Sequence, residues 1–451
     1  METSLTRKLC VLGAGESGVG AAILARDKGY DVFVSDKGPI SEKYKKQLED
    51  EQIAYEELKH SEEKIVLADV IVKSPGIPET APLIVMLREM GKEIIGEIEF
   101  ASRYTDAKLI AITGSNGKTT TTLLTYSILK NAGVNVGLAG NIGKSFALQV
   151  AREQFGVYVL EISSFMLDDM YAFKADIAVL LNITPDHLDR YDHKMENYVD
   201  SKFRILQNQT SNDVFVYCAD DPETLGGLLR HHTDAKVYPF SQKIEIKEGA
   251  YLNQEREIVI NIPKQEQFKM AIKDLALQGM HNVYNNMASG IVSKVWELRN
   301  ESIRESMGEF VNIPHRLEFV SCISGINFIN DSKATNVNSV WYALESLPEK
   351  IVLIMGGVDK GNDYAMLQEL MHDKVRAIVC LGKDNVRIHD AFEDEVDVIV
   401  NTQNMNEAVE VSYHLAQKGD TVLLSPACAS FDLFKNYEDR GDQFKAAVKE
   451  L

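Results

Sequence analysis

The sequence predicts an α/β protein with three domains. Apolar runs of strand length alternate along the chain with stretches of helical periodicity. Two of these strands end in a glycine-rich turn that opens a helix, at residues 9–18 and 109–120. The 451 residues have room for two to four domains of about 150 residues each. We therefore expect a Rossmann-like domain over residues 1–97, a central P-loop ATPase-like domain over 98–311 and a Rossmann-like domain over 312–451.

The composition excludes several classes of protein. Hydrophobic residues make up 45% of the chain and charged residues 25%, which is ordinary for a globular protein in water. No apolar run reaches the roughly 18 residues of a membrane span. The five cysteines are scattered without a CxxC pair, which fits a reducing cytosol better than a disulfide or zinc framework. A formal charge of −19 disfavours nucleic acid as a partner, and we expect a cytoplasmic monomer.

The first domain begins with a strand, a turn and a helix in KLCVLGAGESGVGAAILARDKG, residues 8–29. Gly13, Gly15 and Gly18 fit the GxGxxG fingerprint of dinucleotide sites. Asp36 ends the next strand, near the expected position of the acidic residue that binds a ribose. The fingerprint alone is weak, and both NAD(H) and a UDP-sugar remain possible ligands of this turn.

The central domain opens with a phosphate-binding turn in AITGSNGKTT, residues 111–120. Backbone N–H groups of such a turn and of the following helix point at an anion. Lys118 would reach the β- and γ-phosphates of ATP, and the Thr119 hydroxyl would ligate Mg²⁺. Ile112 stands where the full Walker pattern has glycine, so the match is to a shorter variant over 114–120. The alternative is an ordinary strand–helix turn, but the coincidence of strand, glycines, Lys, Thr and helix favours ATP.

Polar residues follow other predicted strands, where ligands bind in parallel α/β sheets. Ser74 and Asn141 each follow a short strand. Glu161 ends an apolar strand and would share a Mg²⁺ with Thr119. His187 lies in the loop after the next strand and would bind a second cation or the substrate. The alternatives are a turn residue for Ser74 and a solvated edge residue for Glu161.

Three further features have two interpretations each. Lys202 lies in the helical stretch 195–206, and composition alone makes it a surface lysine. Asn282 and Asn285 lie near a helix start, where amides bind a purine edge or cap the helix. Arg316 lies at a domain junction, where it would close over a nucleotide or remain on the surface.

The third domain returns to alternating strands and helices. Its turns after the strands contain two lysines and several hydroxyls, which suit a small carboxylate. Turn formation alone also favours these residue types. The residues are Asp331, Lys333, Thr335, Lys360, Ser430 and Phe431.

Several of these motifs together resemble the Mur ligases. The central ones are TGSNGKTT, LEISSF, NITPDHLDRY, the Lys202 helix, GMHNVYN and PHRLE. Three C-terminal motifs resemble the member of the family that adds D-glutamate, namely NDSKATN, GGVDKG and LSPACASFDLFKNYEDRG. The resemblance runs from about Gly13 to Gly441, nearly the whole chain.

The resemblance implies an enzyme of bacterial peptidoglycan synthesis with ATP as its cosubstrate. It would phosphorylate the carboxylate of UDP-N-acetylmuramoyl-L-alanine to an acyl phosphate. The amine of D-glutamate would then attack, leaving an amide, ADP and phosphate. Two anions must come together in this reaction, so cations must offset their repulsion.

The resemblance also assigns roles to residues. Those that bind the ATP phosphates are Gly114, Ser115, Asn116, Gly117, Lys118, Thr119 and Thr120. Two Mg²⁺ sites are implied, one at Thr119 and Glu161 and one at His187 and Lys202, with Lys202 carbamylated by CO₂. The catalytic set is Lys118, Glu161, His187 and Lys202. The rest of the nucleotide would meet Asn282, Asn285, Arg316 and Asp331.

Two further sets would bind the other substrates. The UDP-sugar would contact Gly15, Glu16, Ser17, Gly18, Asp36, Lys37, Ser74, Asn141 and His187. D-Glutamate would contact Lys333, Thr335, Lys360, Ser430 and Tyr437.

The sequence departs from the family pattern at three positions. Met166 stands where Gln is frequent, Tyr437 replaces Phe, and Gly38 replaces a basic residue whose part Lys37 would take. Three alternatives remain: a folylpolyglutamate-type ligase of the same chemistry, an NAD-dependent oxidoreductase, and a nucleotide switch without catalysis.

Overall fold

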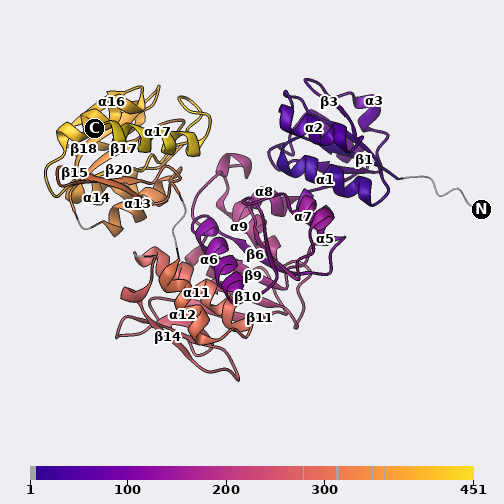
Figure 1. The fold of residues 1–451 in the computed structure, drawn as a ribbon, viewed down its shortest axis with the longest axis horizontal. Helices are drawn as coiled ribbons and strands as arrows, with labels where there is room; N and C mark the ends of the chain where they lie inside the picture. The colour runs from indigo at the N-terminus through magenta and orange to yellow at the C-terminus, as the bar shows by residue number, and fades with distance from the viewer. Residues whose placement is uncertain (1–6, 278, 311–313, 348, 360) are drawn as a thin grey trace, which may run out of the picture. The chain divides into compact units, whose positions relative to one another are not determined.

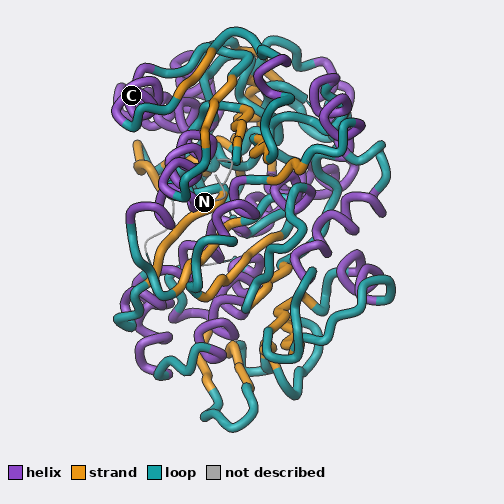
Figure 2. Tube along the Cα trace, turned by 90° about the vertical axis from the view of Figure 1, so that its right-hand side faces the viewer, coloured by secondary structure: helices purple, strands orange, loops and turns teal. Residues whose placement is uncertain are grey.

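The computed structural model describes residues 7–277, 279–310, 314–347, 349–359 and 361–451. Contacts divide the chain into two compact units. One unit comprises Met1–Leu275 with Asn282–Phe310, and the other comprises Ala276–His281 with Val311–Leu451. Helices and strands alternate through both units, and the strands form three sheets (Figures 1 and 2). The α/β class with three sheets is therefore as predicted.

The N-terminal sheet has five parallel strands in the order β3-β2-β1-β4-β5. Its strands are β1 (Lys8–Leu12), β2 (Asp31–Ser35), β3 (Ala54–Glu56), β4 (Val70–Lys73) and β5 (Glu93–Ile95). Its helices are α1 (Glu16–Asp27), α2 (Glu42–Asp50), α3 (Glu62–Ile65) and α4 (Pro82–Glu89). Helix α1 packs closely on the turn before it. A Cβ on Gly18 would lie 1.9 Å from the Gly13 carbonyl oxygen, so only glycine fits there.

The central sheet has nine strands in the order β14-β13-β12-β11-β10-β9-β6-β8-β7. From β12 to β7 in this order, β6 included, neighbouring strands pair in parallel. At the other edge, β13 pairs antiparallel with both β12 and β14. The strands are β6 (Lys108–Thr113), β7 (Val136–Gly140), β8 (Val157–Glu161), β9 (Ile177–Leu180), β10 (Val214–Cys218), β11 (Lys236–Ser241), β12 (Gly249–Leu252), β13 (Glu257–Asn261) and β14 (Phe268–Ala271). The parallel part carries the predicted strand ends at one edge of the sheet.

The helices of this part of the chain follow the predicted order. They are α5 (Glu97–Ser102), α6 (Lys118–Asn131), α7 (Phe146–Arg152), α8 (Ser164–Asp168), α9 (Met195–Phe203), α10 (Pro222–Leu228), α11 (Met280–Val295) and α12 (Asn300–Glu309). Short 3₁₀ turns are η1 (Leu188–Arg190), η2 (Arg204–Leu206) and η3 (Ile272–Asp274).

The first two sheets belong to one unit because polar and apolar contacts join them. The Glu97 carboxylate accepts hydrogen bonds from Ser145 Oγ and Ala147 N, both at 2.7 Å, at the start of α7. Lys73 Nζ lies 2.8 Å from Asp169 Oδ2, and both side chains are buried. The apolar cluster that contains the core of β1 and β2 continues into β8 and β9. This part of the chain therefore has a continuous core.

The C-terminal unit has a six-stranded sheet in the order β15-β16-β20-β17-β18-β19, with β15 antiparallel to β16 at its edge. Its strands are β15 (Glu318–Ile323), β16 (Ile326–Asn330), β17 (Ile351–Met355), β18 (Val375–Leu381), β19 (Ile399–Thr402) and β20 (Thr421–Leu424). Its helices are α13 (Val337–Ser346), α14 (Gln368–Lys374), α15 (Val386–Phe392), α16 (Met405–Leu415) and α17 (Tyr437–Glu450), with η4 at Ala365–Leu367.

The predicted domain limits at residues 97 and 311 stay predictions, and residues 311–313 lie outside the described chain. Among the described residues, no helix is both long and apolar enough to cross a bilayer.

Candidate functional site

The phosphate loop joins β6 to α6 as the sequence predicts. Gly114 and Gly117 have φ angles of 156° and 80°, in the region that favours glycine. Gly117 is the residue before the first turn of α6 and has a left-handed conformation. A Cβ there would lie 2.4 Å from Asn285 Oδ1 on α11. The loop is therefore closely packed, and its glycines are required by both conformation and space.

The segment after β9 supports this loop. Ser115 Oγ donates a 2.9 Å hydrogen bond to the Thr184 carbonyl, and Ser115 N donates to the Asn182 carbonyl at the same distance. Asn116 N donates to Asn182 Oδ1 at 2.9 Å. Because the same segment continues to His187, the loop and the His187 turn are held together by short contacts.

Two lysines converge on the carbonyl of Gly114. Lys118 Nζ donates to Gly114 O at 2.7 Å and to Ser115 O at 2.8 Å. Lys202 Nζ, on α9, donates to Gly114 O at 3.0 Å and lies 4.7 Å from the centre of the Tyr198 ring. Lys202 is only 1% exposed, so its interpretation as a surface lysine is wrong. Burial, and then the charge of Lys118, lowers the pKa of Lys202 well below its usual range.

Glu161 ends β8 between the phosphate-loop strand and β7. It pairs in register with Ile112 on one side and Gly140 on the other. Asn141 Nδ2 donates to Glu161 Oε1 at 2.8 Å, and Asn141 N donates to the Glu161 carbonyl at 2.9 Å. The second carboxylate oxygen, Oε2, is buried and has no hydrogen-bond partner among the described residues. A buried, unsatisfied carboxylate oxygen next to a phosphate loop suits a hard cation.

The residues predicted to bind Mg²⁺ fit that ion in type. Thr119 lies in the first turn of α6 and is 6% exposed. Its hydroxyl and the Glu161 oxygen are the oxygen ligands that Mg²⁺ prefers. Among the described residues, no three His, Cys, Asp or Glu side chains are placed so that they could hold a metal ion together. A metal at Thr119 and Glu161 would therefore take further ligands from substrate or water.

His187 is held on a strained turn. Its φ angle is 53°, and it precedes the 3₁₀ turn η1. The rings of Phe165 and His187 form a T-shaped pair with centres 5.0 Å apart. His187 Nε2 lies 3.6 Å from Asp186 Oδ1. A non-glycine residue in this conformation often belongs to a functional site.

Arg190 connects this turn to the N-terminal sheet, and sequence reasoning did not single it out. Its guanidinium lies 4.2 Å from the centre of the Phe165 ring and donates to the Pro75 carbonyl at 3.3 Å. Pro75 follows Ser74, a predicted substrate contact. The only sequence signal for Arg190 is its place in the NITPDHLDRY motif.

Asn282 and Asn285 lie on α11 and are both buried. Asn285 Oδ1 accepts a 3.1 Å hydrogen bond from Thr121 Oγ1 of α6, and Asn285 Nδ2 donates to Asn282 Oδ1 at 2.9 Å. These amides therefore border the phosphate loop, as an adenine contact would require, and Asn285 packs directly against Gly117.

Two carboxylates at the N-terminal glycine turn accept hydrogen bonds from nearby groups. Asp36 Oδ2 accepts from Ala14 N at 2.6 Å, and Oδ1 accepts from Gly38 N at 2.7 Å. Glu16 Oε2 accepts from Tyr44 OH at 2.8 Å and from Lys43 Nζ at 3.2 Å. Both acids thus have partners within the domain, while Gly15 stands at the start of α1 with open space around its Cβ position.

The other predicted contacts of this turn are near it. Ser74 is adjacent, since a Cβ on Gly13 would lie 2.9 Å from Ser74 Cβ. Lys37 is exposed. Ser17 and Met166 line one small cavity together with Lys73 and Asp169. Met166 is buried in the apolar core, so it packs where a glutamine would have offered a polar contact.

In the C-terminal unit, Asp331 connects two of the family motifs. Its carboxylate accepts from Ser425 Oγ at 2.9 Å and from Leu317 N at 3.2 Å. Burial raises its pKa to about 6, and the neighbouring charge of Arg316 opposes this shift. The charges of Asp331 and Arg316 therefore lie close enough to interact.

Three of the residues predicted to bind the amino acid come together here. Lys333 Nζ lies 5.4 Å from the centre of the Tyr437 ring. Thr335 N donates to the Lys333 carbonyl at 3.0 Å. Ser430 is buried, whereas its neighbour Phe431 is 73% exposed. Lys360 lies outside the described residues.

Arg440 is a second residue that sequence reasoning missed. It is 1% exposed, and it donates to Ser332 Oγ at 3.0 Å, to Ser332 O at 2.9 Å, to Cys428 O at 3.2 Å and to Gly356 O at 3.5 Å. Burial lowers its pKa to about 10. One guanidinium thus joins the turns that follow β16, β17 and β20. The only sequence signal is the EDRG end of the last motif.

Known proteins match along the whole chain. Family models match residues 8–82 (MurD N-terminal domain), 112–293 (Mur ligase middle domain) and 315–428 (Mur ligase, glutamate ligase domain). A relative from Bacteroides fragilis, named UDP-N-acetylmuramoylalanine--D-glutamate ligase, is 57% identical over 446 residues, 99% of this chain and 100% of the relative. The chain belongs to the Mur ligase family. A relative of the same name from Porphyromonas gingivalis is 52% identical and covers 98% of both chains.

Solved Mur ligases have the same fold. The Thermotoga maritima UDP-N-acetylmuramate-alanine ligase MurC has a TM-score of 0.63 at 20% identity, covering 98% of this chain and 99% of that one. The T. maritima MurF ligase in complex with ADP has a TM-score of 0.60 at 14% identity over 100% of both chains. At these identities the likeness concerns the fold alone, and it confirms the predicted three-part α/β architecture of a Mur ligase.

Proposed function

We propose that this Mur ligase joins D-glutamate to UDP-N-acetylmuramoyl-L-alanine, with ATP converted to ADP and phosphate, in peptidoglycan synthesis. The observation that carries the proposal is the 57% identity over the full length to a ligase named for this reaction. It supports a UDP-sugar over NAD(H) as the ligand of the N-terminal glycine turn. The oxidoreductase, folate-ligase and switch alternatives each leave one of the three matched domains without a role.

In the first step a carboxylate oxygen of UDP-N-acetylmuramoyl-L-alanine attacks the γ-phosphorus of ATP, and ADP leaves. The residues of the phosphate loop, Gly114 to Thr120, hold the phosphates through backbone N–H groups. Lys118 donates to the phosphate oxygens and offsets the repulsion between the two anions. Asn282, Asn285, Arg316 and Asp331 hold the remainder of the nucleotide.

Mg²⁺, when bound, neutralises phosphate charge and polarises the oxygens around the γ-phosphorus. Thr119 and Glu161 would hold one ion, a role supported by the unsatisfied Oε2 of Glu161. His187 and Lys202 would serve a second. The lowered pKa of Lys202 supports its carbamylation, because only a neutral amine attacks CO₂. Its nitrogen forms a bond to the CO₂ carbon and releases one proton to water, so a buried neutral amine becomes an anionic carbamate.

In the second step the amine of D-glutamate attacks the acyl phosphate carbon. The new C–N bond forms, the amine loses its proton, and inorganic phosphate leaves. Lys333 and Lys360 would pair with the carboxylates of D-glutamate, and Thr335 and Ser430 would donate hydrogen bonds. Tyr437 would pack against the amino acid.

The UDP-sugar would bind at Gly15, Glu16, Ser17, Gly18, Asp36, Lys37, Ser74, Asn141 and His187. We expect the enzyme to act as a monomer in the cytoplasm, where ATP is available and where the scattered cysteines stay reduced.

A substrate panel tests this function. Purified protein with MgATP should release phosphate only when both UDP-N-acetylmuramoyl-L-alanine and D-glutamate are present. Equal release with meso-diaminopimelate or L-lysine in place of D-glutamate would contradict the amino-acid assignment. Release without any amino acid would indicate a simple ATPase.

A further inference from the structure

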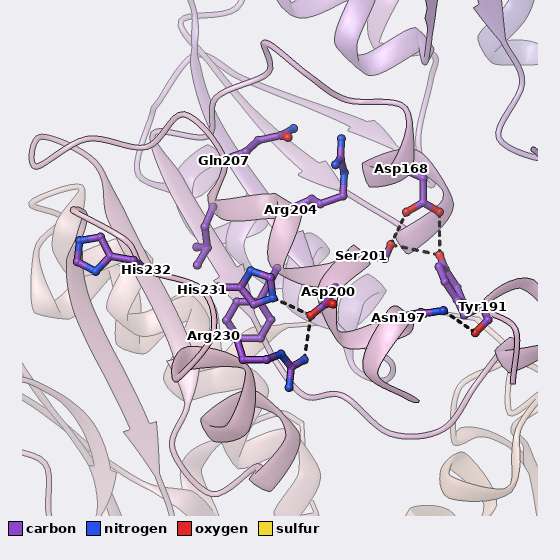
Figure 3. Close-up of a pocket in the computed structure, with 12 residues that line it drawn as sticks. Asp168, Tyr191, Asn197, Asp200, Ser201, Arg204, Gln207, Arg230, His231 and His232 are labelled. Atoms are coloured by element: carbon purple, nitrogen blue, oxygen red, sulfur yellow. Dashed lines mark hydrogen bonds and ion pairs between the residues drawn. The ribbon is translucent and has the colours of Figure 1, made fainter. Parts of the chain in front are cut away.

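A cavity of about 630 Å³ lies in the central domain beside α9, and Figure 3 shows the residues that line it. Residues of α8, α9, η2 and the segment after α10 line it. Asn197, Asp200 and Arg204 face this cavity at helical spacing. Tyr198 and Lys202, on the opposite side of the same helix, contact Ser115 and Gly114. The volume is within the range of small-molecule sites.

The acidic groups of this cavity already have donors. Asp200 Oδ1 accepts from Arg230 Nη2 and is paired with His231 Nε2, both at 2.8 Å. These contacts lower the pKa of Asp200, although burial opposes the shift. Asp168 accepts from Ser201 Oγ at 2.6 Å and from Tyr191 OH at 3.0 Å. Neither carboxylate needs a cationic ligand.

Two donor groups have no anionic partner. Arg204 Nε donates to the Leu167 carbonyl at 2.8 Å and Nη2 donates to the Met170 carbonyl, but among the described residues no carboxylate pairs with its charge. Gln207 Nε2 is buried and has no hydrogen-bond partner in the described chain. Arg204 and Gln207 are three residues apart and extend to the same side in Figure 3, opposite Arg230. A partly buried guanidinium without a carboxylate partner and an unsatisfied amide together favour an anion.

An aromatic pair and a leucine also line the cavity. The rings of Phe203 and His231 are stacked, with centres 4.8 Å apart and planes at 17°. Phe203 is fixed from behind, because a Cβ on Gly227 would lie 2.1 Å from its ring. His231 is partly exposed, and Leu206 also lines the cavity. A flat ring system can stack on such a surface.

We infer that this cavity is a second ligand site, separate from the phosphate loop, for a small organic anion with a planar ring body. Its carboxylate or phosphate binds Arg204 and Gln207, and its ring packs on the His231–Phe203 stack. Because the site is built on α9, its ligand contacts the helix that carries Lys202.

Calorimetric titration of the full chain with 2-naphthoate tests the inference, with 2-naphthamide as the neutral isostere. We expect saturable binding of 2-naphthoate, about tenfold tighter than that of the amide, since charge-assisted hydrogen bonds are the stronger ones. Gln207→Met removes the amide at constant volume and should weaken 2-naphthoate binding by about threefold to tenfold. The matched control is Gln443→Met on α17, which should leave binding unchanged.

A second pair of variants tests the aromatic surface. His231→Ala should weaken 2-naphthoate binding, and His231→Phe should restore it, which separates stacking from the ion pair with Asp200. Melting temperatures of all variants show whether each still folds. No saturable binding, equal affinity for acid and amide, or an unchanged affinity in Gln207→Met would overturn the inference.

Discussion

The phosphate loop and the N-terminal glycine turn have the same backbone arrangement, but lysines contact the first and an aspartate contacts the second. Each is a glycine-rich turn between a parallel strand and a helix. Two lysines converge on the carbonyl of Gly114 in the first. In the second, the Asp36 carboxylate accepts from Ala14 N of the turn and from Gly38 N, which follows Asp36. The two lysines suit the triphosphate that we propose for the phosphate loop. At the N-terminal turn, the Asp36 carboxylate holds the backbone, and the start of α1 remains for the UDP-sugar that we propose there.

The largest effect should come from the loop lysine. Lys118→Met removes the charge that would offset two anions in the proposed reaction, so we expect kcat to fall by about 10²–10³-fold, as for loss of other transition-state donors. Phosphate release under saturating substrates measures it. Lys130→Met, in the last turn of the same helix, is the matched control and should retain full activity. Near-normal turnover in Lys118→Met would mean that the loop does not act on the phosphates.

Lys202→Met tests the second lysine. Because Lys202 would serve the metal site and not the nucleotide itself, turnover should fall by about 100-fold. The affinity for ATP, measured by calorimetry, should change little. Lys194→Met, at the exposed start of α9, provides the control. An equal loss of ATP affinity and turnover would assign Lys202 to nucleotide binding.

A buried acid near the N-terminal turn should make stability depend on pH. Burial raises the pKa of Glu97 to about 7 from an ordinary value of 4.5. Between these values the folded state holds more protons than the unfolded state, so this contribution to stability is complete below pH 4.5 and is lost as pH rises through 7. Glu97→Gln should remove a change of up to about 3 kcal/mol in the free energy of unfolding over this range.

Urea unfolding at pH 5 and pH 8 measures the Glu97 effect. Glu62→Gln, an exposed substitution in α3, should keep the pH dependence of the parent. If Glu97→Gln shows the same pH dependence as the parent, Glu97 does not titrate in this window.

The smallest effect should come from Asp36→Asn. The amide can no longer accept both backbone hydrogen bonds, so stability should fall by about 1 kcal/mol. The KM for the UDP-sugar should rise severalfold while the KM for ATP stays constant. Asp31→Asn, at the exposed start of β2, is the control. A matching rise in the KM for ATP would show that the two turns are not independent.

Local patterns predicted the fold and the glycine turns, because both depend on neighbouring residues. The strand before Gly114, the left-handed position at Gly117 and the helix from Lys118 are all readable over ten residues. Lys202 was different: composition alone suggested a surface lysine in a helix, and only the family resemblance pointed to the site. Its burial arises from a contact 88 positions away in the chain.

Arg190 and Arg440 illustrate the same limit. Their decisive contacts are with Pro75 and Ser332, at separations of 115 and 108 positions. No periodicity or spacing encodes such a pairing. The cavity around Phe203 and His231 is likewise made by segments that meet only in the folded chain.

The position of Arg440 has a consequence for how the C-terminal unit tolerates change. Since one guanidinium binds carbonyl groups in three separate turns, we expect those turns to become ordered and disordered together. A destabilising substitution in one turn should accelerate amide hydrogen exchange in the other two. Substitutions in any one of these turns should therefore be poorly tolerated, because each would loosen the other two.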